Sequence, residues 1–235
     1  MITVFDVCYN KQTGQKLDIH LPDSSEFSVL VYFHGGGLVA GDKCEQKTFF
    51  EFMASHGVAV VSANYRMYPD AKYPDFLIDA ADAVAWVFDN IGNYGKVNGI
   101  YVGGSSAGGY ISQMLCFDEK WLAKYNIKPC DITGFIHDAG QPTCHFNVLK
   151  ERGIDSRRVI IDDSAPLYHI GEADEYPPML IIVSDNDMQN RLQKRLKELA
   201  DKGFVRPYKE EKQVEIAKKE DKKETAKPKT RKKAK

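Results

Sequence analysis

A glycine-rich stretch, Gly103-Gly104-Ser105-Ser106-Ala107-Gly108-Gly109, decides how the sequence is interpreted. It contains the pattern G-x-S-x-G, with Ser106 at the centre and a glycine two residues away on each side. This pattern is typical of a strand that turns sharply into a helix, because larger side chains at the glycine positions would collide in so tight a turn. An apolar run precedes the stretch and apolar residues at helical spacing follow it. We therefore predict a strand–turn–helix unit with Ser106 at its apex.

The predicted position of Ser106 suits attack on a carbonyl carbon. Its hydroxyl would lie above a helix N-terminus, and the backbone N–H of Ala107 would point into the same space. The alternative is a glycine-rich turn that carries no chemistry, which the same short motif also fits. The strand predicted before the motif and the helix predicted after it favour a nucleophile.

A second glycine cluster, His34-Gly35-Gly36-Gly37, directly follows the nearly continuous apolar run 28–33. Such a run is typical of a central strand that is covered on both faces. Attack on an ester places negative charge on the former carbonyl oxygen, which then needs hydrogen-bond donors held in position. Glycine lets backbone N–H groups come close to a ligand, so this cluster can supply such donors, although a flexible turn is the alternative.

Strands and helices alternate along the chain. Residues 1–21 alternate polar and apolar side chains and predict two antiparallel edge strands. Further buried strands are predicted by the apolar runs 28–33, 58–62, 132–136 and 179–183. Residues 75–88 have apolar side chains at helical spacing. Such alternation indicates the α/β class, with a mostly parallel sheet and helices on both faces.

In sheets of this kind, ligands bind beyond the C-terminal ends of the strands. The cluster His34–Gly37, Ser106 and Asp187 all follow predicted strands at those ends. We therefore expect the three to meet at one edge of the sheet.

The order of these motifs resembles the α/β-hydrolase fold, and in particular the HGGG-type carboxylesterases and lipases related to hormone-sensitive lipase. The resemblance rests on His34–Gly37, Asn64–Arg66, Gly104–Gly109 and Asp187, and it covers roughly residues 1–200. It implies a serine hydrolase that acts on small carboxylic esters without a cofactor or a metal.

The resemblance also implies a role for particular residues. Ser106 would be the nucleophile and Asp187 the acid of the catalytic triad, with Asp185 as the rival acid two residues earlier. The backbone N–H groups of the oxyanion hole would belong to Gly36, Gly37 and Ala107.

The sequence departs from this family at the catalytic base, which is a histidine that follows the acid. No histidine follows Asp187 in this sequence. We therefore expect the last strand and its histidine loop to be lost or replaced. His137, directly after the strand predicted at 132–136, and His145 are the candidate surrogate bases, although such histidines are more often structural. Two functions stay open: a working serine esterase, or a base-less hydrolase fold that binds a ligand or a partner.

The sequence predicts a hydrolase domain over residues 1–208, followed by a Lys-rich, disordered tail over residues 209–235. Within the domain, the long irregular segment 139–178 is expected to form a lid or binding loop. Residues 206–235 carry 13 Lys and Arg residues against 6 Asp and Glu residues, whereas the whole chain has a net charge of −1. No aromatic residue follows Tyr208, which argues against nucleic-acid binding by the tail.

The five cysteines show no C-x-x-C spacing, so neither a zinc site nor a disulfide framework is expected. The sequence shows no charged leader followed by an apolar run, and no apolar stretch of membrane-spanning length. We expect a cytoplasmic protein whose partner is a small-molecule ester rather than a membrane. The sequence does not indicate an oligomeric state.

Overall fold

The fold is described from a computed structural model of the 235-residue chain, covering residues 1–173, 175–183, 194, 197–198 and 201. The strands are β1 (Ile2–Asn10), β2 (Gln15–Leu21), β3 (Glu26–Phe33), β4 (Val58–Ala63), β5 (Lys96–Ser105), β6 (Gly134–Asp138) and β7 (Met179–Ile182). The α-helices are α1 (Lys47–Ser55), α2 (Asp75–Asn90), α3 (Ala107–Phe117), α4 (Lys120–Ala123), α5 (Phe146–Glu151) and α6 (Pro166–His169). Two short 3₁₀ helices are η1 (Ile91–Tyr94) and η2 (Pro129–Asp131).

The strands form one mixed sheet in the order β1-β2-β4-β3-β5-β6-β7. The N-terminal strands β1 and β2 pair antiparallel, and β2 also pairs antiparallel with β4. From β4 onward, the neighbours β3, β5, β6 and β7 are all parallel. The mostly parallel sheet predicted from the sequence is therefore confirmed. Of the predicted pair of edge strands, β1 lies at the edge while β2 lies one strand inward.

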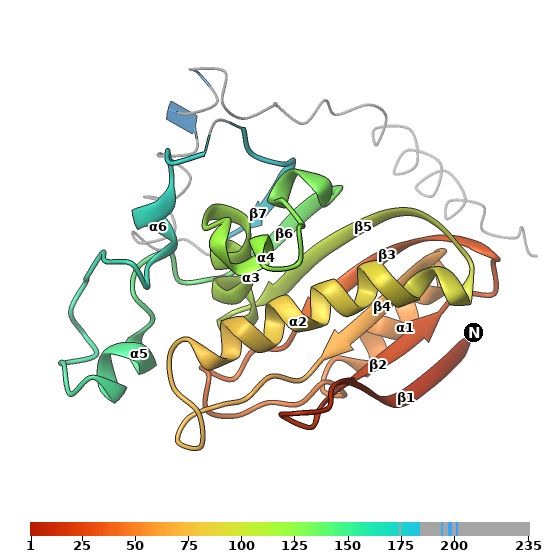
Figure 1. Ribbon diagram of the computed structural model, residues 1–235, viewed down its shortest axis with the longest axis horizontal. Coiled ribbons are helices and arrows are strands. Elements are labelled where there is room, and N and C mark those ends of the chain that lie inside the picture. Colours follow the sequence, from red (N-terminus) through yellow and green to blue (C-terminus); the bar gives the residue numbers. More distant parts are fainter. Residues whose placement is uncertain (174, 184–193, 195–196, 199–200, 202–235) are drawn as a thin grey trace, which may run out of the picture.

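Helices cover the two faces of the sheet unequally (Figure 1). On one face, α2 and α3 pack against the sheet, and alternate residues of β3 such as Val29, Val31 and Phe33 point into that core. On the other face, Phe50 of α1 packs against Leu30 and other residues of the sheet. The near-continuous apolar sequence of β3 follows from this arrangement, because both of its faces are buried.

Strand β7 departs from the sequence prediction of a buried strand. Its pairing with β6 sets Leu180 beside Ile136 and Ile182 beside Asp138. The side chains of Leu180 and Ile182 are 56% and 47% exposed. The prediction was wrong here because an apolar run does not reveal whether a helix covers the strand on both faces.

The segment expected to form a lid, residues 139–178, begins directly after β6 and carries the two short helices α5 and α6. Figure 1 shows both helices displaced to one side of the sheet and its covering helices. Hydrogen bonds tie the segment to the rest of the fold. The Tyr110 hydroxyl of α3 donates to the carbonyl of Ser164 at 2.6 Å, and the Tyr73 hydroxyl donates to the carbonyl of Asp163 at 3.1 Å.

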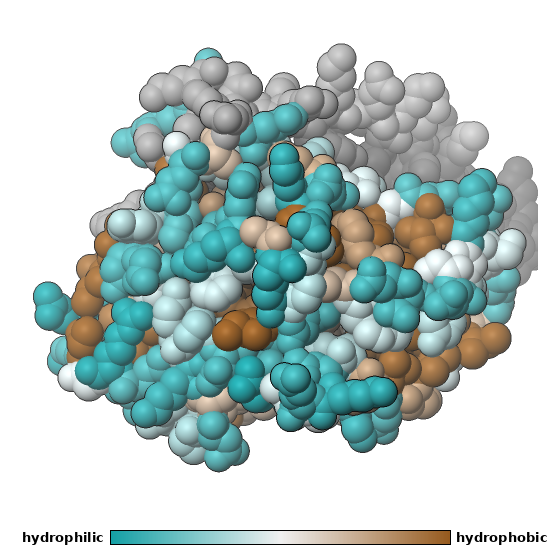
Figure 2. Space-filling view, in the orientation of Figure 1, coloured by the Kyte–Doolittle hydropathy of each residue, from teal (hydrophilic) through white to brown (hydrophobic). Residues whose placement is uncertain are grey.

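The face of the molecule seen in Figure 2 is mostly hydrophilic. Hydrophobic colour gathers towards the right and left edges of this view. Ile2 and Phe5 of β1 are among the exposed large hydrophobic side chains. Within the described part of the chain, no helix combines the length and the hydrophobicity that crossing a membrane requires. The tail predicted at 209–235 lies outside the described residues.

Candidate active site

Ser106 occupies a strained turn between β5 and α3. Its backbone angles are φ 55° and ψ −112°, a region that residues other than glycine rarely adopt. A hydrogen bond of 2.8 Å from the Ser106 backbone N–H to the carbonyl of Asp138, at the end of β6, holds the turn. The Ser106 side chain is exposed, although the helix that follows it is entirely buried. The strand–turn–helix unit expected from the sequence is therefore present.

Steric crowding explains why glycines flank Ser106. A Cβ at Gly104 would lie 2.5 Å from the carbonyl oxygen of Phe33, and a Cβ at Gly108 would lie 1.9 Å from the same oxygen. Both contacts are far shorter than van der Waals distances and involve backbone, which has little room to move. The G-x-S-x-G pattern thus allows α3 to start directly against the end of β3.

The glycine cluster predicted to supply hydrogen-bond donors lies beside Ser106. Strands β3 and β5 are parallel neighbours, and Phe33 pairs with Gly104. The loop after Phe33 therefore begins next to the serine turn: a Cβ on Gly35 would be 3.4 Å from the Cβ of Ser106. Gly36 and Gly37 have φ angles of 107° and 67°, which favour glycine at both positions.

Three backbone N–H groups around this turn have no hydrogen-bond acceptor within the described residues: those of Gly36, Gly37 and Ala107. Unpaired N–H groups of buried backbone are rare, since leaving one without a partner costs free energy. Ala107 is fully buried and Gly37 is half-buried. This part of the chain can therefore donate to an anionic or strongly polar ligand atom.

His34 fixes the start of the glycine loop. Its Nδ1 donates to the carbonyl of Gly35 at 2.7 Å, and its ring stacks on Tyr65 with 4.4 Å between centroids. The Tyr65 hydroxyl in turn donates to the His34 carbonyl at 2.8 Å. Burial of the ring lowers the pKa of His34. A Cβ on Gly41 would lie 2.3 Å from His34 Nδ1, so the loop closes tightly around this ring.

Helix α5 of the predicted lid contacts the other side of the glycine loop. The Asn147 side-chain Nδ2 donates to the carbonyl of Gly37. At the start of the helix, His145 Nδ1 accepts a hydrogen bond of 3.2 Å from the Asn147 backbone N–H. His145 thereby caps the helix, as side chains with a free acceptor do at helix N-termini.

The structure gives both candidate surrogate bases partners other than Ser106. His137 lies in β6, fully buried, and its Nδ1 is 2.9 Å from the Ser112 hydroxyl. Burial lowers the pKa of His137 to about 3 and that of His145 to about 4. Such weakly basic imidazoles are poorly matched to proton transfer near neutral pH. Their assignment as bases stays a prediction, and their surroundings favour structural roles.

The buried His137 predicts a loss of stability in acid. An unfolded histidine has a pKa near 6.5, so below that pH the unfolded chain binds a proton that the folded chain does not accept until about pH 3. Between pH 7.5 and pH 5 this linkage should remove roughly 2 kcal/mol from the free energy of unfolding. Urea unfolding at the two pH values measures the loss. In His137→Phe the loss should shrink by about this amount, and an equal loss in both proteins would contradict the linkage.

The predicted acid, Asp187, and its rival Asp185 lie outside the described residues. Within the described residues, no group of three or more His, Cys, Asp or Glu side chains is arranged to hold a metal ion.

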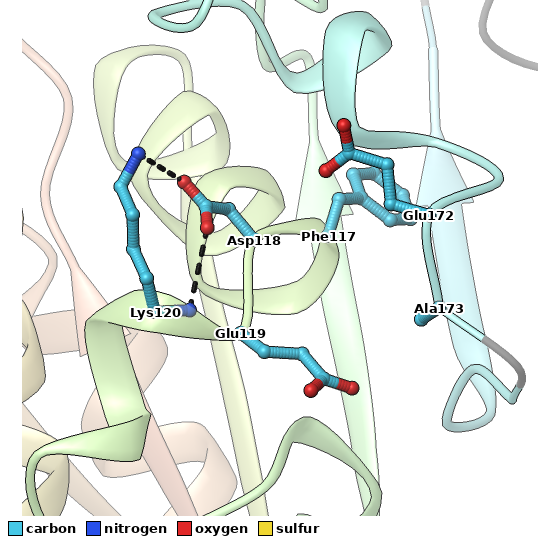
Figure 3. A pocket seen from close by; sticks show the side chains of 6 residues that line it. All are labelled: Phe117, Asp118, Glu119, Lys120, Glu172 and Ala173. Carbon is cyan, nitrogen blue, oxygen red and sulfur yellow. Dashed lines mark hydrogen bonds and ion pairs between the residues drawn. The ribbon is translucent and has the colours of Figure 1, made fainter.

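A pocket in the structure lies away from Ser106, beyond the far end of α3 (Figure 3). Its lining residues are Phe117, Asp118, Glu119, Lys120, Glu172 and Ala173. Ser106 and Asp118 flank the 11-residue helix α3, which places them about 18 Å apart along its axis. The Asp118 carboxylate is already paired with the Lys120 ammonium at 2.6 Å. The geometry at Ser106, rather than this acidic pocket, therefore defines the candidate active site.

Comparison with known sequences agrees with this geometry. The family model BD-FAE matches residues 17–129, which include both glycine clusters. Esterase LipI of Mycobacterium tuberculosis is 38% identical to the chain over 96 residues, covering 40% of this chain and 30% of LipI. Kynurenine formamidase of Danio rerio is 30% identical over 129 residues, covering 54% of this chain and 42% of the relative. The chain spans less than half the length of these curated relatives.

Solved esterase structures share the fold. Esterase B from Lactobacillus rhamnosis superimposes with a TM-score of 0.68 at 17% identity, covering 87% of this chain and 72% of the esterase. The apo form of Thermogutta terrifontis esterase 2 gives a TM-score of 0.66 at 20% identity, covering 86% of this chain and 82% of the esterase. At such identities the likeness establishes the fold alone.

The sheet order, the serine turn and these neighbours define a protein of the α/β-hydrolase fold. In sequence, the chain is similar to the BD-FAE family model over residues 17–129 and to esterases such as LipI over part of their length.

Sequence reasoning missed two residues that touch the glycine loop, Phe146 and Asn147. Both belong to α5, whose six residues are too few to show helical periodicity. The sequence His145-Phe146-Asn147 does carry a signal in retrospect, since a side-chain acceptor two residues before Asn147 is typical of a helix start. Their contact with Gly37 spans 110 residues of sequence and becomes visible only in the fold.

Proposed function

We propose that this chain carries the active site of a serine carboxylesterase-type hydrolase for small carboxylic esters, with Ser106 as the nucleophile. In this reaction the Ser106 hydroxyl oxygen attacks the ester carbonyl carbon and the hydroxyl proton passes to a base. The carbonyl oxygen becomes an oxyanion, the alcohol then leaves, and water releases the acyl group from the serine.

One observation carries this proposal: the strained, exposed Ser106 lies beside a glycine loop whose N–H groups are unpaired among the described residues. A serine in such a turn is held away from the core, and the surrounding protein bears the conformational cost. The N–H groups of Gly36, Gly37 and Ala107 are the proposed donors to the oxyanion. Donors fixed before the reaction stabilise developing charge without having to reorganise.

In the proposed triad, Asp187 is the acid. This assignment rests on the family resemblance and on the position of Asp187 after β7 in the sequence. The proposal does not assign the base that would accept the Ser106 proton. No histidine follows Asp187 in the sequence, and among the described residues His137 and His145 have hydrogen-bond partners other than Ser106. This observation favours the second candidate function, a hydrolase fold of low catalytic power that binds an ester or a similar ligand.

A covalent probe tests the assignment of the nucleophile. Prolonged incubation with a fluorophosphonate, followed by peptide mapping, should place the adduct on Ser106, because only this serine has the two flanking glycines that permit the strained turn. Ser106→Ala should abolish the adduct, while Ser105→Ala is the matched control and should retain it. An adduct on Ser105, or an unchanged adduct in Ser106→Ala, would refute the assignment. The absence of any adduct would favour the binding function.

A further inference from the structure

An exposed aromatic side chain, Phe146, lies against the glycine loop. It is 42% exposed, whereas its helical neighbours Val148 and Leu149 are buried in the core. A Cβ placed on Gly37 would be 3.4 Å from Cζ of Phe146 and 3.9 Å from its Cε2. The edge of the ring therefore faces the side of Gly37 on which a side chain would stand, next to the residue proposed to bind the oxyanion.

Neighbouring contacts fix the position of this ring. Phe146 stacks on the His145 ring with 4.3 Å between centroids, and His145 is itself buried and lies 5.2 Å from the ring of Tyr110 on α3. The next residue, Asn147, donates its side-chain hydrogen bond to the Gly37 carbonyl. Phe146 is thus held between an anchored histidine and an anchored asparagine. Such a support limits the rotation of an exposed ring and fixes where it meets a ligand.

A ligand would account for this exposure. When the loop donors hold the carbonyl oxygen of an ester, the acyl chain and the alkoxy group both begin two bonds away from that oxygen. An apolar ring against Gly37 therefore lies where one of these substituents must pass.

We propose that Phe146 is a specificity-determining residue that forms the apolar wall of the substituent subsite next to the glycine loop. It selects esters whose substituents carry several carbons over methyl-sized ones. This inference rests on the proposed function, because it takes Ser106 as the reacting group. Burial of each additional CH₂ against such a wall strengthens binding by about fourfold.

A pair of organophosphates tests the inference on the full chain. Dimethyl and dibutyl p-nitrophenyl phosphate both react by formation of an Oγ–P bond at Ser106 and cleavage of the bond between phosphorus and p-nitrophenolate. The serine proton is released to the buffer, and the phenolate reports the rate. Both remaining arms of each reagent change together, so no assumption about which arm faces Phe146 is needed. The measured quantity is the ratio of the dibutyl to the dimethyl rate.

Three variants define the outcome. Phe146→Ser should lower the ratio about tenfold, Phe146→Leu should restore most of it, and Phe52→Ser should leave it unchanged. Phe52 is the matched control, since it is an exposed phenylalanine on a short helix, 57% exposed on the opposite face of the sheet.

Three results would overturn the inference. An unchanged ratio in Phe146→Ser, while Ser106 still reacts, would reject Phe146 as a specificity-determining residue. It would not contradict the proposed function. An equal loss of both rates together with a lower melting temperature would assign the ring a structural role. Failure of the unmodified chain to react at Ser106 with either reagent would instead reject the proposed function, and the inference with it.

Discussion

The unmodified chain is expected to hydrolyse carboxylic esters at least about a thousandfold more slowly than a version given a histidine after Asp187. Loss of the catalytic histidine alone costs on the order of a million-fold in turnover in a well-studied serine protease. The oxyanion hole and substrate binding still supply roughly a thousand- to ten-thousandfold acceleration over water. Ser106 without a base should retain only this second part.

The comparison requires a chimaera in which residues 209–235 are replaced by a final strand and histidine-bearing loop from an esterase of the same fold. Hydrolysis of a short-chain p-nitrophenyl ester series gives kcat for both proteins. The matched control is the same chimaera with its new histidine changed to glutamine, which keeps the graft and removes the base. Equal rates in the chimaera and this control would contradict the expectation.

Ordinary esterase rates in the unmodified chain would also contradict it. The next variants would then be His145→Gln and His137→Gln, since these two residues are the remaining candidates for the base. A loss of activity in only one of them, with the melting temperature unchanged, would identify it.

Replacing Gly108 with alanine is expected to destabilise the fold by on the order of 3 kcal/mol, the upper range for overpacked sites. The added Cβ would sit 1.9 Å from the Phe33 carbonyl oxygen and 2.8 Å from that of His34. Alanine has a higher helix propensity than glycine by about 1 kcal/mol, so propensity alone predicts the opposite sign. A lower free energy of unfolding in Gly108→Ala would show that the steric overlap outweighs helix propensity, and a higher one would show the reverse.

Gly92→Ala is the matched control for this substitution. Gly92 has no atom within 4 Å of the position of its added Cβ, so its replacement should change stability by less than about 1 kcal/mol. Urea unfolding of both variants measures the difference. A Gly108→Ala protein as stable as Gly92→Ala would show that β3 and α3 can separate at little cost.

Much of the fold could be predicted from the sequence because its core strands are apolar runs, two of which lead into glycine motifs. Both runs that lead into those motifs became strands, β3 and β5, and the helix after the serine turn became α3. Burial on both faces of a parallel sheet produces this pattern directly. Strand β7 was mispredicted in its burial because the same apolar pattern also arises in a strand whose side chains stay partly exposed.

The candidate site was predictable only in part, for a different reason. Ser106, Gly36 and Gly37 belong to motifs whose residue types follow from backbone geometry, so the sequence reveals them. Phe146 and Asn147 lie beside a loop more than 100 residues earlier, and nothing in their local sequence indicates that neighbour. The packing of His137 against Ser112 depends equally on tertiary neighbours, which composition and spacing do not encode.

The hydrogen bond from Ser106 to the carbonyl of Asp138 has a consequence for how the domain can be divided. The segment shared with the family model ends at residue 129, before β6 begins at Gly134. A fragment cut at that boundary would keep the serine motif and lose the carbonyl that holds its turn, together with the strand that lies beside β5. The segment that the family model matches is thus shorter than a folding unit able to maintain the serine geometry, and attempts at minimisation or circular permutation should keep β6 joined to it.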